Sequence, residues 1–121
     1  MISATLLPSE HQDQCAVVAW FQVQFPKVRI LSIPNGAHLA GSEKQRAIQV
    51  QRLLKEGLSP GAPDLYVPAW RLWIEMKRTK NGRVSAEQQA WHEYLTGIGD
   101  RVILARGFEE ARAGIMEIAR S

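Results

Sequence analysis

Apolar side chains recur along this chain with two different spacings, which together predict a mixture of helices and strands. Intervals of three and four residues predict helices within residues 9–25, 42–56, 85–96 and 108–119. Alternating or β-branched stretches predict strands at residues 27–33, 64–67, 71–77 and 101–105. The order is helix, strand, helix, two-stranded hairpin, helix, strand, helix. We therefore expect one mixed α/β domain spanning residues 1–121.

Polar residues at the helix boundaries support this assignment. Ser9 with Gln12, and Ser85 with Gln88, have the spacing of a capping box, in which each residue satisfies a free backbone N–H near the other. Ser42 provides a further N-cap. Proline and glycine residues then predict where helices end, at Pro26, Gly57 and Gly97.

The helical spacing also predicts which side chains face the core. The first helix should bury Ala16, Ala19, Trp20 and Val23, the second Ala47, Val50, Leu53 and Leu54, and the last Phe108, Ala111, Ile115 and Ile118. We expect the strand at 101–105 to be buried on both faces. Cys15 lies in an apolar helical pattern, which favours core packing over reactivity.

Composition limits the class of protein. Hydrophobic residues make up 45% of the chain and charged residues 22%, as in ordinary globular domains. No apolar run is long enough to span a membrane, and residues 1–7 lack the charged start of a signal peptide, so we expect a soluble cytoplasmic protein. A single cysteine excludes an internal disulfide. The formal net charge of +3 permits an acidic partner such as nucleic acid without requiring one.

Candidate chemistry gathers in residues 61–77. If strands 64–67 and 71–77 pair as a hairpin through Pro68-Ala69-Trp70, Asp64 comes alongside Glu75. Side chains alternate along a strand, so Glu75 and Lys77 share a face, about 7 Å apart. The opposite face, directed at the core, carries Leu72, Ile74 and Met76. Two carboxylates and an ammonium would then converge, and such hard oxygen ligands suit Mg²⁺ or Mn²⁺.

A simpler interpretation exists for each part of this pattern. Charges alternate with apolar residues on any half-exposed strand, so Glu75 and Lys77 alone could belong to a solvated, salt-bridged face. Their combination with Asp64 is more informative, because grouping these charges is not required for stability.

The resemblance to a known family rests on these residues and on further motifs in the same order. Asp64, Glu75 and Lys77 follow the pattern of the PD-(D/E)xK nucleases. The other motifs are Ser9-Glu10-His11-Gln12 with Gln14 and Trp20, Ile33-Pro34-Asn35-Gly36, Leu54-Lys55-Glu56-Gly57, Gly61-Ala62-Pro63-Asp64-Leu65, Ile74-Glu75-Met76-Lys77, and Ser85-Ala86-Glu87-Gln88 with Trp91. Together they resemble the VRR-NUC family of that superfamily, in particular its small stand-alone members of the kind found in phages.

This resemblance implies a restriction-endonuclease-like core, a mixed central sheet flanked by helices. It implies that Asp64 and Glu75 bind Mg²⁺ or Mn²⁺, with the backbone carbonyl of Met76 as a third ligand. Lys77 would orient or activate the attacking water and offset charge on the phosphate. Glu10 would help to hold the metal or its waters, and Gln88 would support the site. Both of these residues also have simpler explanations. The helix dipole favours an acid such as Glu10 in the first helical turn, and Gln88 could serve only to close a capping box.

Basic and polar residues near this stretch are candidates for DNA contact. Arg78, Lys80 and Arg83 directly follow the strand that carries Glu75 and Lys77. Asn35 precedes a polar loop, although it is most simply a turn residue, and Lys55 is most simply a cation at a helix C-terminus. No signature of base-specific recognition is present, so we expect recognition of DNA shape.

We therefore expect a metal-dependent DNA endonuclease. A homodimer would bring two sites together, as resolution of a four-way junction requires, and this favours a structure-selective enzyme of the Holliday-junction type. Two alternatives remain: a nicking, flap or duplex nuclease of the same fold, and a DNA-binding module without catalysis. A structural protein with a solvated charged strand is a further possibility.

Overall fold

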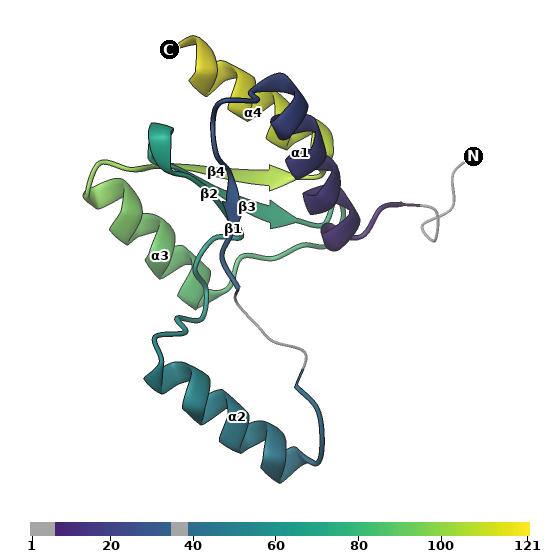
Figure 1. The fold of residues 1–121 in the computed structure, drawn as a ribbon, viewed down its shortest axis with the longest axis vertical. Helices are drawn as coiled ribbons and strands as arrows, with labels where there is room; N and C mark the ends of the chain where they lie inside the picture. The colour runs from purple at the N-terminus through teal and green to yellow at the C-terminus, as the bar shows by residue number, and fades with distance from the viewer. Residues whose placement is uncertain (1–6, 35–38) are drawn as a thin grey trace.

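A four-stranded mixed sheet organises the chain, with helices on both of its faces (Figure 1). The computed structural model describes residues 7–34 and 39–121. The helices are α1 (Glu10–Gln24), α2 (Glu43–Lys55), α3 (Ala86–Gly97) and α4 (Phe108–Arg120), with a 3-10 helix η2 (Pro68–Trp70). The strands are β1 (Leu31–Ser32), β2 (Leu65–Val67), β3 (Leu72–Lys77) and β4 (Arg101–Arg106).

The strands lie in chain order, β1-β2-β3-β4. β1 and β2 are antiparallel, β2 and β3 form the predicted hairpin around η2, and β3 and β4 are parallel. Parallel neighbours require a crossover connection, and α3 provides it between β3 and β4. α1 and α4 lie on one face of the sheet and α3 on the other (Figure 1).

The core lies between the sheet and the helices α1 and α4. Alternation along β3 sends Leu72, Ile74 and Met76 into it, as predicted, with at most 1% of each side chain exposed. The remaining members come from β2, β4, α1 and α4: Leu65, Val67, Ala105, Val17, Phe21, Ala111 and Ile115. The predicted inward face of the last helix is confirmed, with Ala111 and Ile115 buried and Phe108 and Ile118 partly buried.

All three predicted N-caps are confirmed. Ser9, Ser42 and Ser85 each accept a hydrogen bond from the backbone N–H three residues on. In each case the side-chain oxygen of the glutamine at that position accepts a hydrogen bond from the backbone N–H of the capping serine. α2 therefore also begins with a capping box. Because these bonds join residues three apart, the helix starts are determined locally.

The predicted rotation of α1 is wrong for three of its four residues, whereas Trp20 is partly buried and packs against the core as expected. Val17 and Phe21 are buried instead, together with Asp13, whereas Val23 is 83% exposed and Ala16 and Ala19 are also exposed. α1 carries apolar residues on several sides, so spacing alone does not select one face. Phe21 does so by packing against the hairpin end, with its ring centroid 5.5 Å from that of Trp70.

The same rotation places Cys15 at the surface, which contradicts the expectation of core packing. Its Sγ lies 3.5 Å from His11 Nε2, one helical turn away. Cys15 is therefore on the solvent side of α1, away from the core residues Val17 and Phe21.

The inward face predicted for α2 is also wrong. None of its side chains is buried, and the apolar residues Ile48 and Leu54 are 56% and 39% exposed. The helix extends away from the sheet (Figure 1). Its apolar spacing is correct for an amphipathic helix, and Val50 and Leu53 are partly buried, but Ala47, Ile48 and Leu54 are exposed.

Two strands differ from their predictions because of their places in the sheet. In the predicted strand at 27–33, Leu31 and Ser32 pair with β2, and the Ile33 N–H donates one further hydrogen bond to the Asp64 carbonyl at 2.8 Å. β4 was expected to be buried on both faces, but Leu104 is 39% exposed. β4 is an edge strand, and α3 covers only part of it. Within the described residues, no helix is both long and apolar enough to cross a lipid bilayer.

The corrected rotation of α1 makes a direct prediction. Phe21→Ala should lower the free energy of unfolding by about 3–5 kcal/mol, since it removes a fully buried ring from the core. Val23→Ala, on the exposed side, should change it by less than about 0.5 kcal/mol. Urea denaturation followed by circular dichroism measures both. Equal losses would contradict this orientation of the helix.

Candidate active site

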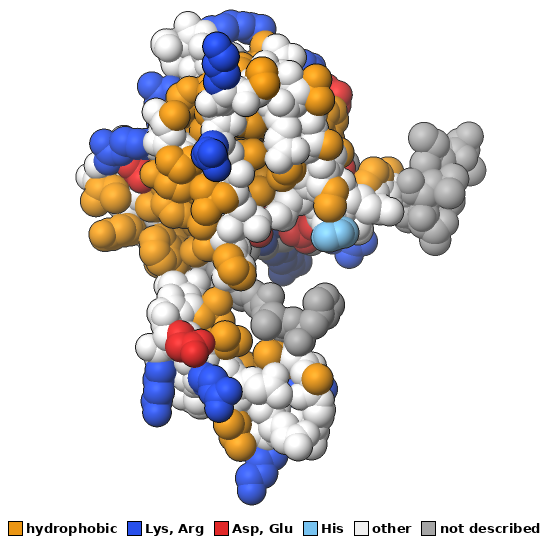
Figure 2. All heavy atoms as spheres, in the orientation of Figure 1, with side chains coloured by type: hydrophobic (Ala, Val, Ile, Leu, Met, Phe, Trp, Pro, Cys, Tyr) orange, Lys and Arg blue, Asp and Glu red, His pale blue; other side chains and the backbone are white. Residues whose placement is uncertain are grey.

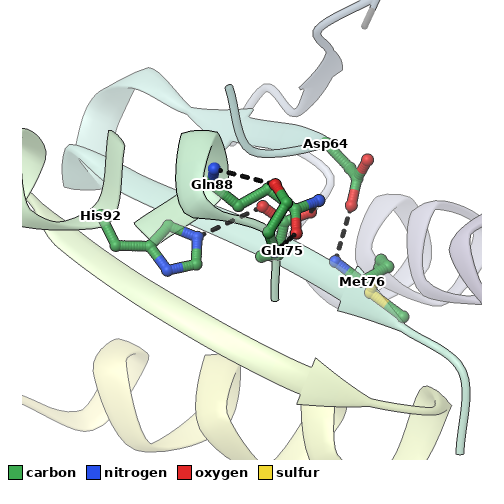
Figure 3. Close-up of polar contacts among 6 residues, drawn as sticks. Asp64, Glu75, Met76, Gln88 and His92 are labelled. Carbon is green, nitrogen blue, oxygen red and sulfur yellow. Dashed lines mark hydrogen bonds and ion pairs between the residues drawn. The ribbon is translucent and has the colours of Figure 1, made fainter. Parts of the chain in front are cut away.

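The hairpin brings two carboxyl groups together at the face of the sheet that α3 covers. Leu65 pairs with Ile74, so Asp64, one residue earlier, lies across from Glu75 as predicted. Asp64 Oδ2 accepts a hydrogen bond from the Met76 N–H at 2.7 Å. The Glu75 side chain is buried, with 1% of its surface exposed. The Asp64 carboxylate is therefore oriented by the backbone of the strand that carries Glu75 (Figure 3).

The environment of Glu75 favours its protonated form. Burial is the main reason that its pKa rises from 4.5 to about 8. A hydrogen bond with the Asp64 carboxyl and the negative charges of Asp64 and Glu10 add to this, while the charge of Lys77 opposes it. Two acids this close favour sharing one proton. A divalent cation placed between them would relieve the same repulsion.

Lys77 lies on the same face as Glu75, two residues further along β3, and is 7% exposed. The following loop explains this burial. Gly82 lies so close to Lys77 that a Cβ there would be 3.1 Å from the lysine Cβ, and its carbonyl accepts a hydrogen bond from Arg106 Nη1 at 2.5 Å. The Lys77 side chain is thus enclosed by the protein instead of extending into solvent, and its charge acts on Glu75.

Gln88 makes a capping contact and a contact with Glu75, the two kinds of contact considered from the sequence. Its Oε1 accepts a hydrogen bond from the Ser85 N–H at 2.9 Å, closing the capping box of α3. Its Nε2 donates to Glu75 Oε2 at 3.4 Å. The cap fixes the amide orientation, so the donor is directed at the acid.

His92 is a site residue that the sequence interpretation missed. Its Nε2 lies 3.2 Å from Glu75 Oε1, and its side chain is 13% exposed. Burial, with a contribution from the charge of Lys77, lowers the pKa of His92. One signal was available: His92 follows Gln88 by four residues, so the two share a helix face.

The other predicted residues lie at different places around this centre. Glu10 begins α1 and is partly exposed, and its charge acts on Glu75. Arg78, Lys80 and Arg83 are exposed on the loop that follows β3, and Lys55 is exposed near the end of α2. Figure 2 shows basic side chains along α2 as well. Asn35 lies outside the described residues.

The tryptophans near the hairpin pack within the protein. The Trp73 ring stacks on Tyr66 with centroids 4.1 Å apart, and its Nε1 donates to Asp100. Trp70 contacts Phe21 and Phe25.

The donor set fits a hard divalent cation that keeps several waters. Among the described residues, no group of three or more His, Cys, Asp and Glu side chains is arranged to hold a metal ion. Mg²⁺, however, usually binds through only one or two carboxylates and retains water elsewhere. Asp64 and Glu75 provide such a pair, and their mutual repulsion supplies a reason for a cation to bind.

Comparisons with known proteins place this geometry in a known fold. No family model matches the sequence, and no curated protein matches it. A solved structure described as a VRR_NUC domain protein superposes with a TM-score of 0.76 over 93% of this chain and 89% of its own. The two sequences are 22% identical.

The chain has the fold of that VRR_NUC domain protein. The predicted mixed central sheet flanked by helices is thereby confirmed. Sequence identity this low establishes the architecture and not the chemistry.

The raised pKa of Glu75 predicts a pH-dependent loss of stability in metal-free buffer. Below pH 4.5 the acid is protonated in both the folded and the unfolded state, so it has no effect. Between pH 4.5 and 8 only the folded state keeps the proton, so wild-type stability falls, by an amount on the order of a few kcal/mol.

Glu75→Gln should remove this loss. The thermal midpoint of the variant, relative to wild type, should rise by about 5 °C or more between pH 5 and pH 8.5 in EDTA. Glu93→Gln, at an exposed position of α3, should follow wild type. Parallel pH curves for Glu75→Gln and wild type would show that Glu75 is ionised normally.

Proposed function

We propose that this protein is a Mg²⁺- or Mn²⁺-dependent endonuclease that hydrolyses DNA phosphodiester bonds. The observation that carries the proposal is the buried Glu75, in contact with Asp64 and on the same sheet face as the buried Lys77. Burying Glu75 and Lys77 next to the partly exposed Asp64 opposes folding, so their grouping is better explained by chemistry. The likeness to the VRR_NUC domain protein supports a nuclease in general.

In this proposal different side chains bind the metal, orient the attacking water and position the metal ligands. Asp64 and Glu75 supply carboxylate oxygens to the cation, with Met76 contributing its backbone carbonyl and Glu10 acting through water. Once bound, a divalent cation lowers the pKa of water and stabilises negative charge on a phosphodiester. Lys77 places an ammonium beside the reacting phosphate, where it orients the attacking water and offsets developing charge. Gln88 keeps Glu75 directed toward the cation.

The exposed cations on the loop after β3 are placed to hold the DNA backbone. Arg78, Lys80 and Arg83 follow Lys77 directly, so they are near the candidate metal site. Lys55 extends the basic surface onto α2. Contacts of this kind go to phosphates and are independent of base sequence.

We further propose that the active form is a homodimer that cuts branched DNA. One domain of this size offers one candidate site, whereas a four-way junction requires two symmetric cuts. The apolar residues Ile48 and Leu54, which α2 leaves exposed, are suited to burial by another molecule. A second copy of the chain would satisfy both requirements.

Labelled DNA substrates test this proposal. Purified protein incubated with Mg²⁺ or Mn²⁺ should make paired, symmetric cuts in a four-way junction, with much weaker activity on a flap and on a linear duplex. EDTA should abolish cleavage. Sedimentation of the same sample should give twice the chain mass of 13.6 kDa.

The alternatives predict different results. Equal cutting of linear duplex would exclude structure selectivity, and cutting of flaps alone would favour a flap nuclease. A monomer would exclude the dimeric junction enzyme. DNA binding without cleavage under any divalent metal would identify a non-catalytic DNA-binding module.

Substitution of the buried lysine separates catalysis from binding. Lys77→Ala should lower the cleavage rate by at least about a hundredfold, since it removes the charge next to the reacting phosphate. DNA affinity, measured by fluorescence anisotropy, should change little because the exposed loop cations remain. Lys27→Ala, at an exposed position before β1, is the matched control and should cleave as wild type does. Retained cleavage in Lys77→Ala would refute the assigned role.

A further inference from the structure

His92 and Gln88 hold the two oxygens of Glu75 from one helix. Gln88 Nε2 donates to Oε2 at 3.4 Å, and His92 Nε2 lies 3.2 Å from Oε1. The two side chains are one turn apart on α3, so they project from the same face. Figure 3 shows both reaching Glu75 from α3, while Asp64 approaches from the start of β2. The carboxyl group is thus restrained on every oxygen.

α3 is itself fixed at several points, so it can act as a rigid support. Trp91 Nε1 donates to Ser59 Oγ at 3.1 Å, and Leu95 is buried with 2% exposure. Gly61 lies against the backbone of Glu87 and Gln88, so closely that a Cβ there would be 2.6 Å from Glu87 C. These contacts fix the backbone positions of Gln88 and His92, and thus the region that their side chains can reach.

The burial of His92 argues for a polar role. An imidazole in a mostly buried position requires a hydrogen-bonding partner, and the Glu75 carboxyl is the partner found. If filling space were sufficient, an apolar side chain would be more stable at this position. When Glu75 is ionised, as a metal ligand must be, His92 Nε2 carries the N–H and donates to Oε1.

We propose that His92 is a positioning residue of the candidate metal site, whose Nε2–H fixes the direction in which Glu75 presents its oxygens to a divalent cation. The proposal rests on the proposed function, because it assigns Glu75 as a metal ligand. Hydrogen bonds to ligating groups typically change metal affinity by about 10–100-fold when removed. The chemistry at the phosphate would not involve His92 directly.

Calorimetric titration with Mn²⁺ tests this role on the full chain. His92→Leu fills most of the space without a donor, and His92→Gln restores an N–H at a similar reach. We expect His92→Leu to weaken Mn²⁺ binding by about 10–100-fold, and His92→Gln by no more than about threefold. Glu93→Ala, an exposed neighbour on α3, controls for changes in the helix and should bind as wild type does.

Cleavage assays on the same variants separate affinity from catalysis. For His92→Leu the Mn²⁺ concentration giving half-maximal cleavage should rise, while the rate at saturating Mn²⁺ stays near that of wild type. Circular dichroism confirms that each variant is folded. Wild-type Mn²⁺ affinity in His92→Leu would overturn the positioning role, as would equal weakening in His92→Gln and His92→Leu.

Failure of the proposed function would look different. If wild type itself neither bound Mn²⁺ nor cut DNA, the metal site and the role of His92 in it would fall together. If wild type bound and cut normally but His92→Leu was unchanged, only the role of His92 would be excluded.

Discussion

The contact between Asp64 and Glu75 is the constraint on which the rest of the site depends. The hairpin register places one acid across from the other, and burial then makes two negative charges there unfavourable. A protein can respond to such a pair by keeping a proton, by adding a cation or by supplying hydrogen-bond donors. All three responses are combined here, in the raised pKa of Glu75, the nearby Lys77, and the donor Gln88, while His92 contacts the other carboxyl oxygen of Glu75. The proposed divalent ion would replace the proton in this arrangement.

One residue, Gln88, belongs both to the N-terminal cap of α3 and to the candidate site. Gln88 closes the cap of α3 through its amide oxygen and reaches Glu75 through its amide nitrogen. The cap thereby orients a donor that would otherwise be free to rotate. A capping box next to a functional residue is therefore more than a helix signal, because it leaves one amide group available in a defined direction.

Helix α2 differs from the other three helices because it does not pack on the sheet. Three helices pack on the sheet, while α2 extends away from it with apolar side chains at its surface (Figures 1 and 2). An amphipathic helix of this kind is stabilised mainly by what its apolar face contacts. The exposure of Ile48 and Leu54 on α2 is the reason that homodimerisation is part of the proposed function.

Much of the architecture follows from the sequence alone, since it depends on neighbours in the chain. The capping boxes join residues three apart, and the alternation along β3 separates Glu75 and Lys77 from the core residues Leu72, Ile74 and Met76. The hairpin and its Asp64–Glu75 juxtaposition were predictable for the same reason. Only the tertiary structure decided the rotation of α1 around Phe21, the exposure of Cys15 and α2, the burial of Lys77 under its loop, and the arrival of His92 at Glu75. Each depends on which distant surface is within reach, and a one-dimensional pattern of apolar and polar positions does not contain that information.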